Sequence, residues 1–405
     1  MPRRSSANMA RQKIMESFSK LALKKSYKDI SLKEISELAG ISVPSFYTYF
    51  DSKEDMLRYY IDYSLEHLEN LINSHLGQAV SASITIRYLL HILSTLLEDR
   101  ILTAFHRVFR EYEFVEKSLA KLYYKRLFDL LGSFIGERLY ELSYQDPRII
   151  SLAIVGSSSF IYLFRKIFNL EGSILIDIEV SGDLLLKGLG SQRVPEVLPI
   201  ENPPDLVELM DRYGALEVPG MPKGKKPILM ATLDILSSKS FKDTKIYEIM
   251  DRAGYSVGSF YKIYRSKEEL LEDLVIIIGR TLRKYLSECI EGIEDPAEIE
   301  AKGSACFLGF VRKNENIYRI VREAAYIDLS IAMKYHIPFL KRYAERLSAE
   351  AERGLIRTFN TESLAIALMG INHTAGIEVR MLEGMDERKV LEGLARIYAK
   401  GVLSA

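Results

Sequence analysis

Three features of the sequence predict an all-α protein of two fused halves: a long internal repeat, helical spacing of apolar residues, and a proline-rich break. The segment Lys13–Leu57 matches Pro227–Leu271 without a gap at an offset of 214 residues. Apolar residues recur three and four positions apart along most of the chain, and the one short strand candidate, 174–180, precedes a helical pattern. A repeat this long indicates a duplicated multi-helix module rather than a solenoid.

We expect five segments. Residues 1–64 and 227–278 form two helix-turn-helix domains, and residues 65–190 and 279–405 form two larger helical domains. Between them, residues 191–226 hold the prolines that exclude a long helix there, and a short helix at Asp205–Tyr213 can interrupt this linker. Its proline content predicts a semi-rigid connection.

Composition limits the classes of protein to which the chain can belong. The chain has 405 residues, 48% of them apolar and 27% charged, which is typical of a soluble globular protein. No signal peptide is visible and no apolar run reaches the ~20 residues of a membrane span, so we expect a cytoplasmic protein. Two cysteines exclude a disulfide framework, and six histidines without ligand spacing predict no metal site. We expect no cofactor.

The first copy of the repeat has the spacing of a helix-turn-helix. Ser31 and Glu34 form a capping box that starts one helix, and Gly40 suits the left-handed turn that ends it. Ser42 then caps a second helix, in which Pro44 occupies the first turn. Two helices and a short turn within about twenty residues fit this motif.

The second helix of the motif has the pattern of a DNA reader. Phe46 and Phe50 share one side and should be core, whereas small side chains face outward and let the helix approach a major groove. Lys53 at the start of the following helix can reach a phosphate. The outward residues are Val43, Pro44, Ser45 and Thr48.

The stretch AGISVPSFYTYFDSKEDML resembles the signature of the tetracycline-repressor (TetR) family, over about fifty residues in each copy. The resemblance implies an all-helical fold, a DNA-binding domain, and a C-terminal domain that binds a small ligand and dimerises. It places the recognition helix at Ser42–Phe50 and phosphate contacts on Ser31, Tyr47 and Lys53.

The second copy departs from the first in ways that add positive charge. Lys245 replaces the cap Ser31, so Thr244 or Asp243 is expected to cap instead, and Lys262 replaces Thr48. We still expect this copy to bind DNA. Its candidate DNA contacts are Thr244, Lys245, Ser256, Val257, Gly258, Ser259, Tyr261, Lys262 and Lys267.

The larger domains are rich in aromatic residues, which by default form core. The resemblance implies an apolar pocket among them and hence a small apolar or amphipathic effector. Each half also ends in two apolar helices, and we hypothesise that these pair within one chain, with a homodimer of chains as the alternative. They are Pro147–Phe168 and Ile178–Leu189 in the first half, and Thr361–Leu382 and Glu387–Leu403 in the second.

The sequence therefore predicts a sequence-specific, ligand-responsive transcription regulator that binds double-stranded DNA. The net charge of zero favours a rival, a ligand-binding or scaffold protein of the same fold that has lost DNA recognition. It does not decide the matter, because only the DNA-facing surface needs to be positive. A helical enzyme is a second rival, but no catalytic constellation is visible and we expect no enzymatic activity.

Overall fold

A computed structural model describes residues 2–25, 27–76, 81–95, 99–112, 117–138, 146–216, 221–381 and 385–403. Within these ranges the protein is helical and contains no strand, which confirms the all-α prediction. The first half holds α1 (Pro2–Ala22), a 3-10 turn (Tyr27–Asp29), α2 (Leu32–Ala39), α3 (Val43–Phe46), α4 (Lys53–His75), α5 (Ala82–Thr95), α6 (Arg100–Tyr112), α7 (Lys117–Arg138), α8 (Pro147–Tyr162), a π-helical turn (Leu163–Ile167) and α9 (Ile174–Lys187).

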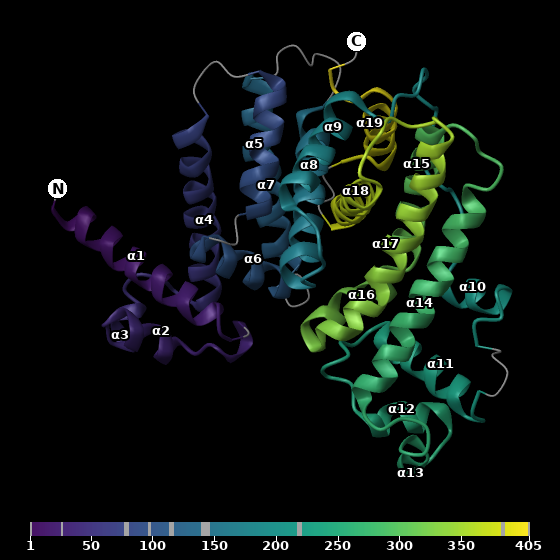
Figure 1. Ribbon diagram of the computed structural model, residues 1–405. Coiled ribbons are helices and arrows are strands. Elements are labelled where there is room, and N and C mark those ends of the chain that lie inside the picture. The colour runs from purple at the N-terminus through teal and green to yellow at the C-terminus, as the bar shows by residue number, and fades with distance from the viewer. Residues whose placement is uncertain are drawn as a thin grey trace.

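After the linker helix α10 (Leu206–Arg212), the second half repeats this order. It holds α11 (Lys225–Leu236), α12 (Ile246–Ala253), α13 (Val257–Phe260), α14 (Lys267–Cys289), α15 (Pro296–Lys313), α16 (Glu315–Ile327), α17 (Leu329–Glu352), α18 (Thr361–Met381) and α19 (Glu387–Lys400). The helix-turn-helix pairs α2–α3 and α12–α13 lie on the lower side of the molecule in Figure 1, one at the left and one at the lower right.

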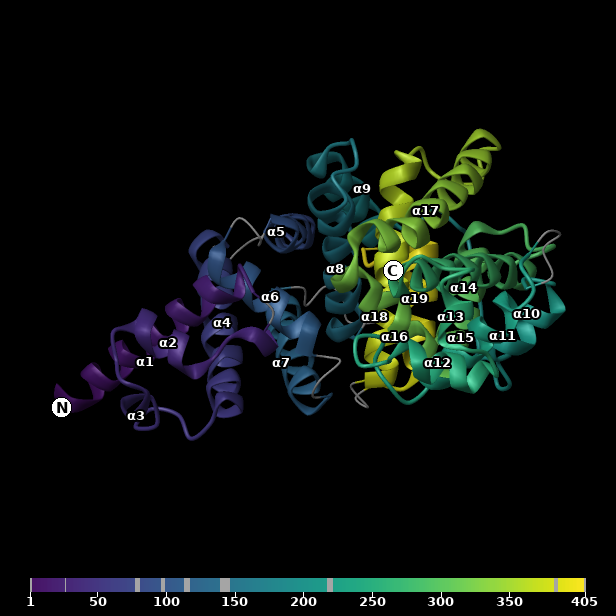
Figure 2. The same cartoon turned by 90° about the horizontal axis from the view of Figure 1, so that it is seen from below.

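The two halves meet through the helices that end each of them. α8 and α9 pack against α18 and α19, and α8 against α18 is the most extensive helix pair among the described residues. Seen from below, these helices lie between the first helix-turn-helix domain and the second (Figure 2). Most residues of α8 are buried. The expectation that no apolar run is long enough for a membrane span is corrected here: by length and composition alone the segment Pro147–Ile167 could cross a membrane, although most of it is buried inside the protein.

Two glycines set the closeness of α8 and α18. A Cβ atom built on Gly156 would lie 2.5 Å from the carbonyl oxygen of Gly370, and Gly370 faces the Gly156 backbone in the same way. These glycines differ by 214 residues, the offset of the repeat. The crossing point therefore lies on the axis that relates the two halves.

Backbone hydrogen bonds repeat across this axis at the ends of α9 and α19. The amide of Leu189 donates to the Tyr398 carbonyl at 2.7 Å, and the amide of Val402 donates to the Leu185 carbonyl at 2.8 Å. The two donors, Leu189 and Val402, differ by 213 residues, and so do the two acceptors, Leu185 and Tyr398, so the exchange is reciprocal, as in the two-fold interface of a homodimer.

The linker is fixed to the second half rather than loose. Asp205 caps α10, which matches the short helix predicted at this position. The Leu206 amide donates to the Asn314 side chain at 2.7 Å, and the same side chain donates to the Pro204 carbonyl at 3.2 Å. Leu209 and Met210 are buried. These contacts add to the stiffness expected from the prolines.

Cys289 at the end of α14 and Cys306 in α15 form a disulfide, with their Cα atoms 6.6 Å apart. The sequence did not predict that the two cysteines pair. One bridge is still not a disulfide framework.

Candidate nucleic-acid interface

The first helix of the first motif, α2, begins and ends as its sequence predicts. The Ser31 hydroxyl accepts from the Glu34 amide at 3.2 Å, and the Glu34 carboxylate accepts from the Ser31 amide at 3.0 Å. Lys25 pairs with Glu34, and this contact, with the bonds from Ser31, lowers the pKa of Glu34 to about 2. Gly40 ends the helix with φ = 72°. The turn into α3 is thus fixed by local bonds.

The recognition helix is shorter than predicted. Ser42 caps α3 and accepts from the Ser45 amide at 3.2 Å, but the helix ends at Phe46 instead of Phe50. The Thr48 and Tyr49 amides donate three residues back, to the carbonyls of Ser45 and Phe46, which tightens the chain into a turn. The expected core position of Phe46 and Phe50 is confirmed.

The candidate readers of the first copy lie on one outward face. Ser42, Pro44, Tyr47 and Thr48 are exposed, and Tyr47 keeps 53% of its surface in solvent. Val43 and Ser45 are half-buried. The Thr48 hydroxyl donates to the Ser45 carbonyl, so its oxygen can still accept and its methyl group remains available for apolar contact.

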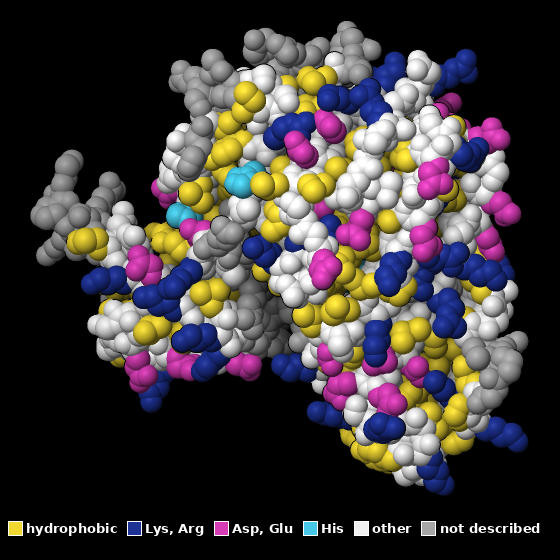
Figure 3. Space-filling model, in the orientation of Figure 1, with side chains coloured by type: hydrophobic (Ala, Val, Ile, Leu, Met, Phe, Trp, Pro, Cys, Tyr) yellow, Lys and Arg dark blue, Asp and Glu magenta, His cyan; other side chains and the backbone are white. Residues whose placement is uncertain are grey.

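The second copy presents the same face with more apolar surface. Ser256, Val257, Gly258 and Lys262 are exposed, Ser259 is half-buried, and Tyr261 is 59% exposed. Tyr247 and Tyr255 are also exposed, and the sequence did not suggest them. Hydrophobic surface is visible at the lower tip of the molecule, over α13, in Figure 3.

Lys53 and Lys267 are bound to backbone carbonyls of their own domains. The Lys53 ammonium donates to the carbonyls of Tyr27 and Ile30 at 2.8 and 2.6 Å. Lys267 repeats this arrangement with the carbonyls of Phe241 and Thr244 at 2.8 and 2.9 Å. The expected phosphate contact therefore has to compete with these internal bonds.

Two expectations for the second copy are corrected. Thr244 is fully buried and its hydroxyl donates to the Ser240 carbonyl, so it neither caps α12 nor faces DNA. The cap position is Lys245, whose side chain has no acceptor for a backbone amide. Of the two hydrogen bonds of a capping box, the one that remains is from the Lys245 amide to the Glu248 carboxylate, at 2.7 Å. Asp243 does not cap either. Lys245 itself is exposed.

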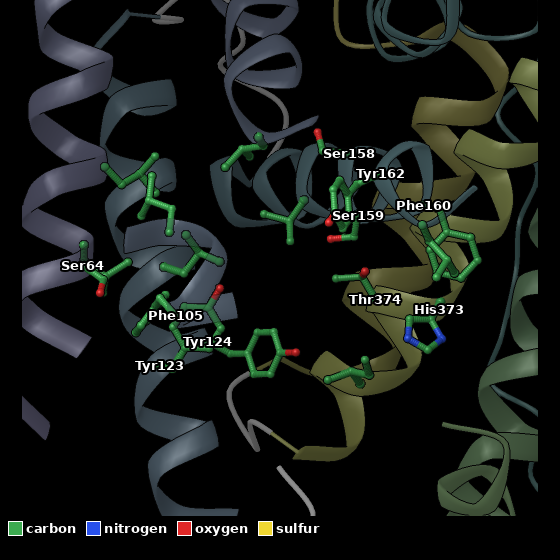
Figure 4. Close-up of a pocket in the computed structure, with 18 of the residues that line it drawn as sticks. Ser64, Phe105, Tyr123, Tyr124, Ser158, Ser159, Phe160, Tyr162, His373 and Thr374 are labelled. Atoms are coloured by element: carbon green, nitrogen blue, oxygen red, sulfur yellow. The ribbon is translucent and has the colours of Figure 1, made fainter. Parts of the chain in front are cut away.

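A cavity lies in each larger domain, beside the helix that leaves the helix-turn-helix. The first, of about 100 Å³, is lined by Ser64 of α4, Phe105, Tyr123 and Tyr124, and by His373 and Thr374 of the other half (Figure 4). The second, of about 240 Å³, is lined mainly by α14, α15, α17 and α18. Phe160 and His373 line both cavities, with ring centroids 5.1 Å apart. The aromatic residues that line them are thus both packing and cavity wall.

Within the described parts of the chain, no group of three or more His, Cys, Asp or Glu side chains could hold a metal ion.

Both helix-turn-helix segments lie within matches to a known family profile. The profile of the bacterial regulatory proteins of the tetR family matches residues 14–60 and again residues 228–274. Among solved structures, a Clostridium perfringens protein named as a fatty acid metabolism regulator is similar over 42% of this chain and 96% of its own, at 17% identity and a TM-score of 0.36. A transcriptional regulator from Pseudomonas aeruginosa PAO1 is similar over 43% and 87%, at 19% identity and a TM-score of 0.35.

Proposed function

The chain is a tandem member of the TetR family, and we propose that it is a sequence-specific repressor that holds one operator with two different recognition units. The observation that carries the proposal is the family match in both halves. Equivalent side chains are exposed in both copies, including Ser42 and Ser256, and Tyr47 and Tyr261. Both units are therefore free to face DNA.

We propose further that the two halves of a single chain pair with each other, so that one chain is equivalent to a homodimer. The packing of α8 and α9 on α18 and α19 supports this, because it uses the end helices of both halves within the chain. Light scattering of the purified protein checks it: a mass near 46.3 kDa is expected, and a mass near twice that value contradicts a self-sufficient chain.

Release of the operator by a small, apolar or amphipathic effector is the third part of the proposal. α4 and α14 each run from beside a recognition helix to the wall of a cavity. A ligand in a cavity would contact the helix that carries the DNA-binding unit. Such a ligand shifts the protein between two arrangements only if it binds one of them better.

Two observations favour the rival, a protein of this fold that binds ligand but no DNA. Lys53 and Lys267 are already bound to carbonyls, and the net charge of the chain is zero. The two candidates differ in whether the surface carries enough positive charge to hold phosphates.

Selection of genomic DNA fragments by the purified chain, followed by titration at several salt concentrations, tests the choice. We expect log affinity to fall linearly with log salt, with a slope of about −0.9 for each phosphate neutralised. A chain with Tyr47→Glu and Tyr261→Glu is the control, because both side chains are exposed and their change should spare the fold. If the chain does not bind DNA, or if its affinity for DNA does not change with salt concentration, the regulator proposal is wrong.

A further inference from the structure

The cavity of the second half combines aromatic walls with positive charge. Tyr335 and Phe339 of α17 and Phe307 of α15 contribute rings, and Arg283, Arg342 and Arg346 contribute guanidinium groups. A cavity with both features suits a ligand that has an apolar body and a polar end.

The carboxylates at this cavity already form ion pairs with one of the arginines. Glu300 is almost fully buried, and it pairs with Arg346 and accepts from the Tyr343 hydroxyl. Arg346 also pairs with Glu350 at 2.5 Å. The charge of Arg346 is therefore balanced within the protein by these two carboxylates.

Arg283 and Arg342 lack such balance. Among the described residues neither one forms an ion pair with a carboxylate, although both line the cavity. The Nη1 atom of Arg283 is buried and has no hydrogen-bond partner, and its guanidinium carbon lies 5.9 Å from the centre of the Phe339 ring. Burial lowers the pKa of Arg283, and the positive charges of Arg342 and Arg280 lower it further. A buried donor without an acceptor is costly, so an anion placed here would gain free energy.

The first cavity carries less of this charge, since among its described lining residues the arginine is Arg322, which comes from the second half. α4 and α14 have bounds that differ by 214 residues at both ends, so Arg283 has Glu69 as its counterpart. Glu69 is exposed, and the first cavity is smaller, about 100 Å³ against about 240 Å³. The duplicated halves have thus diverged at the cavity.

We propose that the second-half cavity binds an organic carboxylate with an apolar body, one molecule per chain, with the carboxylate on Arg283 and Arg342 and the body among the aromatic rings. The inference rests on the proposed function, because it names the chemical class of the effector.

Matched probes test the charge preference on the intact chain by isothermal titration calorimetry without DNA. The probes are decanoate against decan-1-ol, and 2-naphthoate against 2-naphthylmethanol, which distinguish an acyl from an aromatic acid. We expect at least one acid to bind about tenfold or more tightly than its alcohol, at one molecule per chain, because a hydrogen bond to a charged group is worth about 1.5–3 kcal/mol. Equal affinities within both pairs, or two acids per chain, overturn the proposal.

Variants assign the preference to its residue. Arg283→Gln should weaken acid binding by about tenfold to a hundredfold and leave alcohol binding unchanged. Arg342→Gln, at an exposed position that tolerates change, should act in the same direction. Arg280→Gln is the control, since it removes the same charge from an exposed position of α14 outside the cavity. If Arg280→Gln weakens acid binding as much as Arg283→Gln, the site assignment is wrong.

DNA release is measured separately. An acid that binds as expected but leaves operator affinity unchanged contradicts effector release and not the ligand class. A chain that binds DNA yet shows no preference for acid over alcohol contradicts the ligand class alone.

Discussion

Lys53 and Lys267 show how one residue can hold a domain together at a position where its sequence suggests a DNA contact. Each ammonium joins the start of a long helix to the loop before the helix-turn-helix, through two or three carbonyls and the face of an aromatic ring. The carbonyls belong to Tyr27 and Ile30 in one copy and to Phe241, Lys242 and Thr244 in the other. Because the arrangement repeats at the 214-residue offset, we interpret it as structural first.

Lys53→Met is expected to destabilise the first helix-turn-helix by about 1–3 kcal/mol, because two carbonyls lose their charged donor. Hydrogen exchange of the α2 amides should then become faster. Lys33→Met, on the exposed side of α2, is the control and should change stability by less than about 0.5 kcal/mol. Unchanged exchange together with a uniform loss of DNA affinity would instead make Lys53 a phosphate contact.

Burial distinguishes two arginine–aspartate pairs that share helix α9. Arg165 and Asp177 pair at 2.7 Å with almost no exposure, and Arg165 also reaches Glu362 of the second half at 2.9 Å. Arg87 and Asp183 pair at the same 2.7 Å, but both side chains are about one-third exposed. Distance alone would rank the two pairs equally, whereas solvent weakens the second.

Arg165→Met should lower the free energy of unfolding by about 3–5 kcal/mol, because it leaves Asp177 charged and buried without its partner. Arg87→Met is the matched control and should cost about 0–1 kcal/mol. Urea denaturation of both variants measures the difference. Equal losses would mean that the shared helix, and not burial, sets the cost.

At the scale of elements, the sequence predicted helix bounds where capping and periodicity agree, and missed a bound where an apolar run has no clear period. The Ser31–Glu34 box and Gly40 gave the bounds of α2 correctly. α9 was expected from Ile178 but begins at Ile174, since Ser173 caps it and accepts from the Ile176 amide. The apolar run 174–180 hid this start, because a short apolar run fits a strand as well as a helix.

The candidate site could be predicted only in part, for a physical reason. Outward and inward positions follow from helical spacing, so the exposed face of α3 and its buried Phe46 were foreseeable. The burial of Thr244 and the carbonyl partners of Lys53 depend on where a loop folds back, which local spacing does not encode. The unpaired Arg283 likewise becomes visible only when α14 and α17 are packed together.

The crossing of α8 and α18 gives a prediction at this scale. Gly370→Ala should cost about 1–3 kcal/mol or more, because the new methyl group meets the Gly156 backbone and backbone cannot rotate away. Gly303→Ala is the control, because its methyl group would meet only Ile290, at 3.8 Å. This variant should raise the free energy of unfolding by about 0.5–1 kcal/mol, since alanine is favoured over glycine within a helix. Denaturation midpoints of the two variants decide. If Gly370→Ala left the denaturation midpoint unchanged, the two helices would not be in close contact.

The whole molecule combines a symmetric centre with asymmetric ends. Gly156 and Gly370, and the reciprocal bonds of Leu189 and Val402, preserve the two-fold relation where the two halves meet. The recognition faces differ, because the first copy carries Thr48 where the second carries Lys262. A symmetric homodimer presents identical faces to a palindromic site, and this chain does not.

The operator should therefore be an imperfect palindrome. Lys262 has only donors and favours the O6 and N7 acceptors of guanine, whereas Thr48 can place its methyl group against a thymine methyl. Each difference can discriminate by roughly 1–3 kcal/mol per base pair. Selection from random DNA should yield half-sites that differ near the positions read by these side chains, with guanine on the second-copy side.

Lys262→Thr should make the selected site more symmetric, and Lys242→Thr, an exposed change outside the recognition helix, should leave it unchanged. Asymmetry that survives Lys262→Thr would mean that Lys262 does not read the bases.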